Sequence, residues 1–220
     1  MRVCFVENLG GLEKGETSGA VKNKTEELTL AGFSAQEICY EKELKGESRF
    51  FEQAARVSKL HKNLVVCGCV TNTHGHRRKS ALVAENGRIL GVSDATHAID
   101  GEVSSGANLR VYETKIGRVG VVVAEDLYFS EVLHSLAVCG SEWIVCICDG
   151  GVDCIHSALL RAGAFENGVP ILFCAKGYCM VVGANGDLRL ASPNLPICAE
   201  IKKEKEYHLV ETRRRFFRRK

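Results

Sequence analysis

Residues 116–126 read IGRVGVVVAED, the most informative segment of the chain for its fold class. Its centre, Val119–Val123, is a run of small and β-branched residues that predicts a β-strand. Two acidic residues, Glu125 and Asp126, follow the run, and a helix is expected over Ser130–Cys139. A strand that leads directly into a helix is one unit of an α/β fold.

The same alternation of strands and helices extends along the chain. Further helices are expected over Ala20–Leu30, Ser48–Leu60 and His156–Asn167. Strands are expected over Arg2–Glu7, Ala35–Tyr40, Asn63–Thr71, Lys79–Ala84, Arg88–Ser93, Leu109–Thr114, Val119–Val123, Trp143–Cys148, Pro170–Ala175, Tyr178–Val182, Leu188–Ala191 and Ile197–Ile201. Two Asn-Gly pairs, at 86–87 and 185–186, predict hairpins, which a purely parallel sheet would not use so readily. We therefore predict an α/β fold in which helices cover both outer faces of a β-sandwich, a four-layer αββα arrangement.

Length and charge indicate one domain with a short basic end. The chain has 220 residues, which suits a single α/β domain, and we place that domain at residues 1–212. Residues 213–220 carry six positive charges, so the net charge of +2 becomes −4 without them. A mildly acidic body argues against a broad nucleic-acid-binding surface. Cations and two Phe residues could bind an anionic surface, but the default expectation for such a tail is partial order.

The cysteine content predicts a reduced interior. The chain has 11 Cys, an odd number that cannot pair completely within one molecule. Many stand in apolar runs, where free Cys behaves as a small hydrophobic residue. No signal peptide opens the sequence, and no apolar stretch approaches the roughly 20 residues that span a bilayer. We therefore expect a cytoplasmic protein without a membrane partner.

Four segments together resemble landmarks of the nitrilase, or carbon–nitrogen hydrolase, superfamily. They are SALVAENGRILG at 80–91, IGRVGVVVAED at 116–126, RAGAFENGVP at 161–170 and NGD at 185–187, and they occur in the family's order. The resemblance covers about residues 50–215. It implies the αββα sandwich, frequent pairing into a homodimer, and hydrolysis or condensation of amides and nitriles without a metal or cofactor.

The resemblance also implies a Cys nucleophile, a Glu general base and a Lys that stabilises the developing charge. This sequence departs from that set. Ala124 stands in place of the Cys in the pattern G-V-x-x-C-x-D, and Ala95 stands in place of the Lys in K-x-H. The acid should follow the second strand, where Glu41 or Glu43 is the candidate, but the expected Pro-Glu pair is missing and a solvated turn is the favoured interpretation. The usual Glu-Lys-Cys mechanism is therefore not expected.

Other residues near the strand ends are candidates for lining the pocket. In α/β sheets, sites form at the carboxyl ends of strands, and both Cys148 and Cys174 fall near the carboxyl ends of predicted strands. Either thiol is a conceivable relocated nucleophile with His97 nearby, although core packing is the more common role of such residues. Glu125 and Asp126 adjoin the predicted pocket, where we expect them to support the scaffold before any catalytic role.

No metal site is expected. Cys67-Gly68-Cys69 and Cys146-Ile147-Cys148 have one intervening residue, fewer than zinc knuckles use, and His74-Gly75-His76 is typical of a solvated loop.

Three functions remain open from the sequence. The first is a catalytically altered family member that binds a small amide or carboxylate ligand. The second is an amidase-type hydrolase with a relocated thiol. The third is a structural or regulatory dimer whose pocket is filled by side chains.

Overall fold

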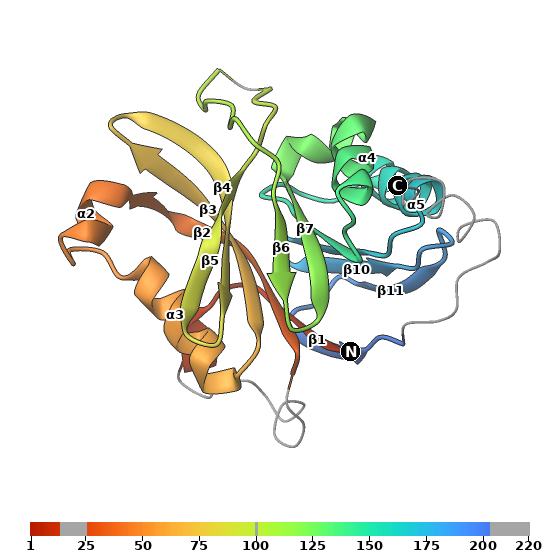
Figure 1. Ribbon diagram of the computed structural model, residues 1–220, viewed down its shortest axis with the longest axis horizontal. Coiled ribbons are helices and arrows are strands. Elements are labelled where there is room, and N and C mark those ends of the chain that lie inside the picture. The colour runs from red at the N-terminus through yellow and green to blue at the C-terminus, as the bar shows by residue number, and fades with distance from the viewer. Residues whose placement is uncertain (14–25, 100, 203–220) are drawn as a thin grey trace.

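The computed structural model describes residues 1–13, 26–99 and 101–202 and contains two six-stranded sheets (Figure 1). The strands of the first sheet are, in spatial order, β12 (Ile197–Glu200), β1 (Arg2–Val6), β2 (Leu28–Cys39), β3 (Leu64–Thr73), β4 (His76–Glu85) and β5 (Arg88–Asp94). Those of the second are β11 (Leu188–Ser192), β10 (Tyr178–Val182), β9 (Ile171–Ala175), β8 (Trp143–Ile147), β7 (Gly117–Val123) and β6 (Val111–Thr114).

The helices occupy the two outer faces, so the layers run helix, sheet, sheet, helix. Helix α3 (Phe50–His61) covers the first sheet, and α4 (Ser130–Val138) and α5 (Cys154–Asn167) cover the second (Figure 1). Two short helices, α1 (Gly10–Glu13) and α2 (Tyr40–Leu44), flank β2 in the sequence. The predicted αββα sandwich is confirmed.

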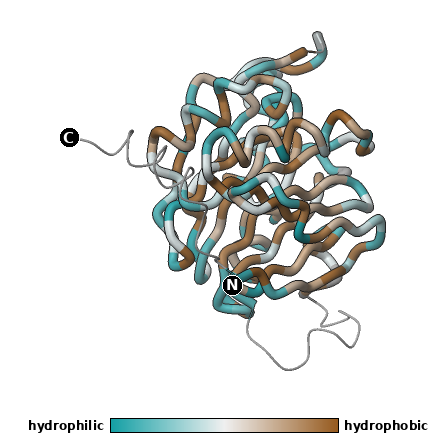
Figure 2. The backbone as a smooth tube through the Cα atoms, turned by 90° about the vertical axis from the view of Figure 1, so that its right-hand side faces the viewer, coloured by the Kyte–Doolittle hydropathy of each residue, from teal (hydrophilic) through white to brown (hydrophobic). Residues whose placement is uncertain are grey.

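Three apolar clusters hold the layers together. The largest lies between the sheets and takes side chains from both, for example Phe5, Val66, Val121 and Val145. A second joins α4 and α5 to the second sheet, and a third joins α3 to the first. In Figure 2, brown hydrophobic segments alternate with teal hydrophilic ones along the chain. Burial of this apolar surface is the main force that favours the sandwich.

Each sheet combines parallel strands with hairpins. Strands β1, β2 and β3 are parallel neighbours, as are β7, β8 and β9. The predicted hairpins join β4 to β5 and β10 to β11. At the first, Asn86 and Gly87 both have positive φ, 49° and 86°, the conformation that this residue pair tolerates best. Parallel β7 and β8 end together, because Val123 pairs with Ile147.

The start of the chain differs from the prediction. A helix was expected over Ala20–Leu30, but Leu28 already begins β2, and residues 20–25 lie outside the described residues. Within β2, Leu28 and Leu30 face the inter-sheet core while Ala31 faces α3, an alternation too short to recognise beside a charged segment. Residues 35–39 of the expected strand Ala35–Tyr40 form the far end of the same 12-residue strand, and Tyr40 begins α2.

The cysteines also differ from the expectation of a fully reduced chain. Cys4 on β1 and Cys198 on β12 form a disulfide between directly paired residues, whereas nine other Cys are free. Most of the free thiols are buried, because six of the nine lie in the interior, where small apolar side chains pack. None of the helices in the described part of the chain has the length and hydropathy needed to cross a membrane. The predicted basic tail at 213–220 lies outside the described residues.

Candidate functional site at the elbow after β7

The chain turns sharply where β7 ends. Ala124 follows Val123 and begins a 3₁₀ helix, Ala124–Tyr128. Its φ is +49°, in the left-handed region, although it is not a glycine. Such a conformation costs an L-residue roughly 1–2 kcal/mol and is retained where surrounding structure imposes it. The methyl group of Ala124 is therefore held at the end of the strand on a strained turn.

Asp126 links this turn, the elbow formed by residues 124–126, to the loop after β5. Its buried carboxylate accepts hydrogen bonds from the backbone N–H of Thr96 (2.8 Å) and of His97 (2.9 Å) and from the Thr96 hydroxyl (2.9 Å). The His97 ring also bonds to it through Nδ1, at 2.8 Å, and stacks on Phe129 with ring centroids 3.7 Å apart. Residues 95–97 are consequently fixed beside residues 124–126.

Ala95 and Ala124 lie in one apolar environment. Their exposures are 4% and 3%, and both belong to the cluster between the sheets. The backbone N–H of Ala95 donates to the carbonyl oxygen of Lys79 at 2.8 Å, so this loop continues the pairing of β4 and β5. The positions at which the resemblance implied a thiol and an ammonium group therefore carry two buried methyl groups.

A phenyl ring packs against the cluster that holds Ala95 and Ala124. Strand β2 pairs with β1 only as far as Ala31, and Gly32 and Phe33 follow that segment. Phe33 packs against the inter-sheet cluster, beside Gly68 of β3. A Cβ atom on Gly68 would lie 2.5 Å from the ring and 2.8 Å from Ile147, so the absence of a side chain at Gly68 accommodates Phe33. The acid that the resemblance implied is expected after the second strand, which ends at Cys39 and is followed by Glu41 and Glu43.

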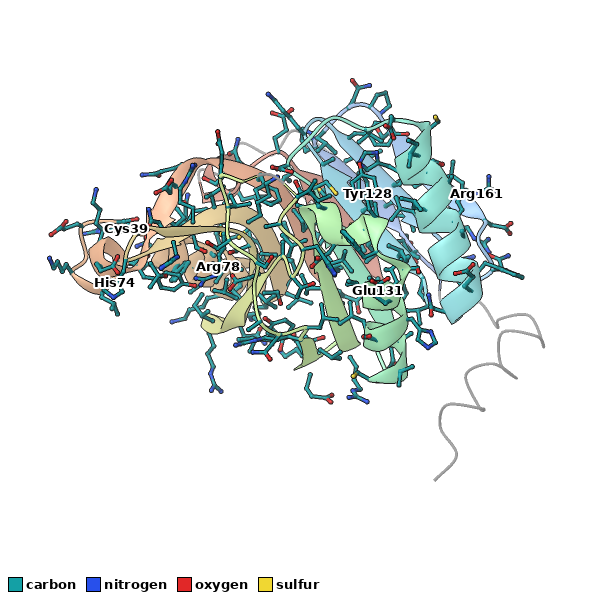
Figure 3. All side chains as sticks on the ribbon, turned by 90° about the horizontal axis from the view of Figure 1, so that it is seen from above. Cys39, His74, Arg78, Tyr128, Glu131 and Arg161 are labelled. Carbon is teal, nitrogen blue, oxygen red and sulfur yellow. A yellow bond between two sulfur atoms is a disulfide. The ribbon has the colours of Figure 1, made fainter. Side chains whose placement is uncertain are left out.

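Glu41 and Glu43 have other partners. Glu41 accepts hydrogen bonds from the Cys39 thiol (2.9 Å) and the His74 N–H (3.2 Å). Glu43 accepts from the Ser48 hydroxyl and from the first backbone N–H groups of α3. In Figure 3, Cys39 and His74 lie at one end of the molecule, away from Tyr128, the last residue of the elbow helix. The structure brings Ala95, Ala124, Asp126 and His97 together but leaves Glu41 at a distance.

A charged group lies next to the elbow. The ammonium group of Lys79, on β4, bonds to the Glu125 carboxylate and lies 3.0 Å from Asp149, the second residue after β8. Burial alone would lower the pKa of Lys79, but hydrogen bonds to the two carboxylates outweigh it and raise that pKa. The Lys79 and Glu125 side chains are 11% and 17% exposed, whereas Asp149 is 34% exposed. The group therefore opens to solvent on the Asp149 side.

Comparison with known proteins identifies the family. The carbon–nitrogen hydrolase family model matches residues 19–212. The chain belongs to the carbon–nitrogen hydrolase family. A curated relative, a probable nitrilase of Schizosaccharomyces pombe, is 25% identical over 130 residues, which make up 56% of this chain and 48% of that protein. The chain thus spans about half the length of this curated relative.

Solved structures of the nitrilase superfamily share the fold. A carbon–nitrogen hydrolase of Helicobacter pylori G27 has a TM-score of 0.75 at 17% identity, covering 98% of this chain and 92% of that one. Nit3 of Saccharomyces cerevisiae, a member of branch 10 of the nitrilase superfamily, gives 0.75 at 16% identity, covering 98% and 93%. A cysteine-to-alanine mutant of the amidase from Nesterenkonia sp. AN1, in complex with butyramide, gives 0.69 at 16% identity, covering 90% and 88%.

The two candidate thiols of this carbon–nitrogen hydrolase family member face different layers. Cys148 belongs to the cluster under α4 and α5, and its thiol lies 3.6 Å from the carbonyl oxygen of Ala124. Cys174 belongs to the cluster between the sheets, where its thiol makes only long contacts, 3.9 and 4.0 Å, with backbone carbonyls. Burial raises the pKa of the Cys174 thiol to about 12. The structure does not gather them into one pocket.

Three residues at or near the site were missed from the sequence. Phe33 carries no sequence signal, because the sequence predicts a strand that begins only at Ala35. The sequence marks Lys79 only as the start of a strand, because its partner Glu125 is 46 residues away. Asp149 carries no signal beyond its place next to Cys148. The matched positions Ala95 and Ala124 were the available signal, because loss of both charge and nucleophile invites a search for nearby replacements.

Proposed function

We propose that this chain is a non-hydrolysing member of the carbon–nitrogen hydrolase family that binds a small amide or carboxylate ligand beside Ala124. One observation carries the proposal. The elbow keeps the strained backbone conformation of Ala124, φ +49°, with a methyl group where a nucleophile is expected. Lys79, Glu125 and Asp149 adjoin this elbow and supply charges of both signs.

Hydrolysis through a covalent intermediate needs a nucleophile that attacks the carbonyl or nitrile carbon. Ala124 offers none, and Ala95 offers no charge to stabilise an oxyanion. The relocated-thiol alternative is less well supported. Cys174 is held as a thiol by burial, and Cys148 packs toward the helical layer. A bound amide would therefore meet groups that hold it but none that cleaves it.

The charged group matches the two ends of an amide. Lys79 supplies a positive charge for a carbonyl or carboxylate oxygen. The Oε2 atom of Glu125 is buried, and no described residue donates a hydrogen bond to it, so it is an acceptor suited to an amide N–H. A ligand would enter on the side of Asp149, the most exposed of the three.

A relative offers a parallel for binding without hydrolysis. A cysteine-to-alanine mutant of the Nesterenkonia amidase has been solved with butyramide bound. Ala124 stands at the position where this chain's own motif predicts cysteine, so an alanine in place of a cysteine occurs together with amide binding in a protein of the shared fold. Butyramide is therefore the first ligand to test.

Calorimetry and an ammonia-release assay together test the proposal. We expect purified protein to bind butyramide without releasing ammonia. Replacing Lys79 with Met should weaken binding by roughly 10–100-fold, the value of a charged hydrogen bond. Lys115→Met, at an exposed turn lysine, is the matched control and should bind normally. Ammonia release abolished by alkylation would establish the relocated-thiol alternative and overturn the proposal.

The third function is a structural or regulatory dimer. Packing of Phe33 against the cluster that contains Ala95 and Ala124 favours it, because side chains then fill part of the space between the sheets. Absence of binding across a panel of amides and carboxylates, together with a stable dimer in sedimentation equilibrium, would favour this function over ligand binding.

Introducing the thiol and the ammonium group that the motif predicts tests whether the site geometry is intact. The double variant Ala124→Cys plus Ala95→Lys should form a covalent acyl adduct with an activated amide, detected as a mass increase on the intact protein. Ala124→Cys alone should react more slowly, because no lysine then stabilises the oxyanion. If the double variant is folded but unmodified, the pocket has changed beyond these two side chains.

A further inference from the structure

A second cluster of reactive groups lies on the first sheet, away from the elbow. Cys4 on β1 pairs with Cys198 on β12, and Glu26 precedes β2. One ligand-type atom from each of these three residues lies within 4.8 Å of the other two. Neighbouring strands β1 and β12 place the sulfurs, whereas the carboxylate comes from the segment that leads into β2.

Glu26 has no evident structural role. Its exposure is 4%, and both carboxylate oxygens are buried without a hydrogen-bond partner among the described residues. An uncompensated buried carboxylate is costly, and native structures rarely leave one unpaired. Burial raises the pKa of Glu26 against the opposing charges of His61 and Arg2. The carboxylate is therefore poised for a partner that the described protein groups do not supply.

His61, the last residue of α3, adds a second unpartnered group to this region. Its Nε2 atom is also buried without a hydrogen-bond partner among the described residues, and its charge acts on Glu26. Two sulfurs, a carboxylate and an imidazole are the ligand types that zinc uses most.

We propose that the reduced chain binds a soft divalent cation, Zn²⁺ as the type case, through Cys4, Cys198 and Glu26. Zinc ligands lie about 2.0–2.3 Å from the ion, so two tetrahedral ligand atoms are roughly 3.3–3.8 Å apart. The Glu26 carboxylate lies within 4.8 Å of both sulfurs, and the sulfurs, which are bonded to each other in the structure, separate to ligand spacing once they are reduced. A water molecule completes the coordination. The ion would neutralise the buried Glu26 carboxylate, which accounts for its lack of a partner among the described residues.

The disulfide makes this site conditional on redox state. In the structure the two sulfurs are bonded to each other. A dithiol reductant donates two electrons, breaks the S–S bond and becomes a disulfide itself, which leaves two thiols on the protein. Zinc then displaces one proton from each thiol as two thiolate–metal bonds form. In the oxidised chain this site has no thiolate to offer and should not bind the ion.

Cobalt provides a direct readout, because thiolate-to-Co²⁺ charge transfer absorbs in the near ultraviolet. The full chain, reduced and then freed of reductant under anaerobic conditions, is titrated with Co²⁺ and back-titrated with Zn²⁺. We expect one equivalent of Co²⁺ with a charge-transfer band, displacement by Zn²⁺, and no band for the oxidised chain. Absence of a band in the reduced, folded wild-type chain would overturn the proposal, and this arm depends on no substitution.

Variants then assign the ligands. Cys198→Ser and Glu26→Gln should each weaken Zn²⁺ binding by at least tenfold in a competition assay with a chromogenic chelator. Cys139→Ser, at an exposed free cysteine, is the matched control and should bind as the wild type does. Circular dichroism confirms that each variant is folded. A Glu26→Gln variant that is folded and binds Zn²⁺ with unchanged affinity would overturn the assignment, because two thiolates alone would then suffice.

Discussion

Replacing Asp126 with alanine tests whether the elbow is held from the loop after β5. The buried carboxylate accepts hydrogen bonds from two backbone N–H groups and one hydroxyl, contributed by Thr96 and His97. Alanine would leave these donors without an acceptor, and each unsatisfied buried donor costs about 1–3 kcal/mol. Because some donors will regain water, we expect the free energy of unfolding to fall by about 3–5 kcal/mol, the range seen when one partner of a buried charged network is removed.

Equilibrium unfolding in urea, followed by circular dichroism, measures this loss. For a chain of this size the same loss corresponds to a fall of roughly 6–20 °C in Tm. Asp126→Asn should fall between wild type and Asp126→Ala, because the amide keeps one acceptor oxygen but places an NH₂ group against a donor. The control Glu131→Gln, at an exposed position in the first turn of α4, should cost less than about 1 kcal/mol. A loss below 1 kcal/mol for Asp126→Ala would refute the idea that this carboxylate fixes the elbow.

Three further predictions follow from neighbouring contacts. Gly68→Ala should lower the free energy of unfolding by about 1–3 kcal/mol, because the added methyl group meets Phe33 and Ile147. Adding Phe33→Leu should recover part of that loss. An equal effect of Gly68→Ala with Phe33 and with Leu at position 33 would contradict the contact between the two positions. Alkylation of Cys174 at pH 8, followed by mass spectrometry, should be about a thousandfold slower than alkylation of the exposed Cys139. The reason is that burial raises the pKa of Cys174 to about 12 and so lowers its thiolate fraction. Comparable rates for the two residues would show that the Cys174 thiol is accessible and ionised. The stability lost in Lys79→Met should be constant from pH 6 to 9. Because the pKa of Lys79 is raised in the folded state, its contribution to stability is complete below the unfolded-state pKa of about 10.4. That contribution is lost only as the pH rises through the folded-state pKa of Lys79. A decrease in the stability difference between wild type and Lys79→Met from pH 7 to pH 9, measured by urea titration, would contradict this.

The layers of the fold could be predicted because their signals are local. Strand periodicity, helix-length apolar stripes and the Asn86-Gly87 turn each depend on residues close together in the sequence. The prediction for the start of β2 was wrong for the opposite reason. Leu28–Ala31 is a strand because its two faces meet two different clusters, the inter-sheet core and the layer under α3. Neither face is visible until the strand is placed between β1 and β3.

The site could be predicted only where a motif marks it. Ala95 and Ala124 were located because their flanking residues keep the family's order. Phe33 depended on the misplaced strand, and the ion pair of Lys79 with Glu125 joins β4 to the elbow across 46 residues. The contact of Cys4 with Cys198 spans 194 residues. Such pairs follow from the sheet order, which a single sequence does not specify.

Ala124 adopts a backbone conformation that its own side chain disfavours. An alanine at φ +49° costs roughly 1–2 kcal/mol, and a glycine would avoid that cost. The elbow therefore persists because the pairing of Val123 with Ile147 and the hydrogen bonds of Asp126 impose it from both sides. The conformation that would present a nucleophile is thus a property of the scaffold and survives without the nucleophile. Under the proposed function, a scaffold that holds this turn rigidly, beside an ion pair that opens to solvent, would bind an amide without cleaving it.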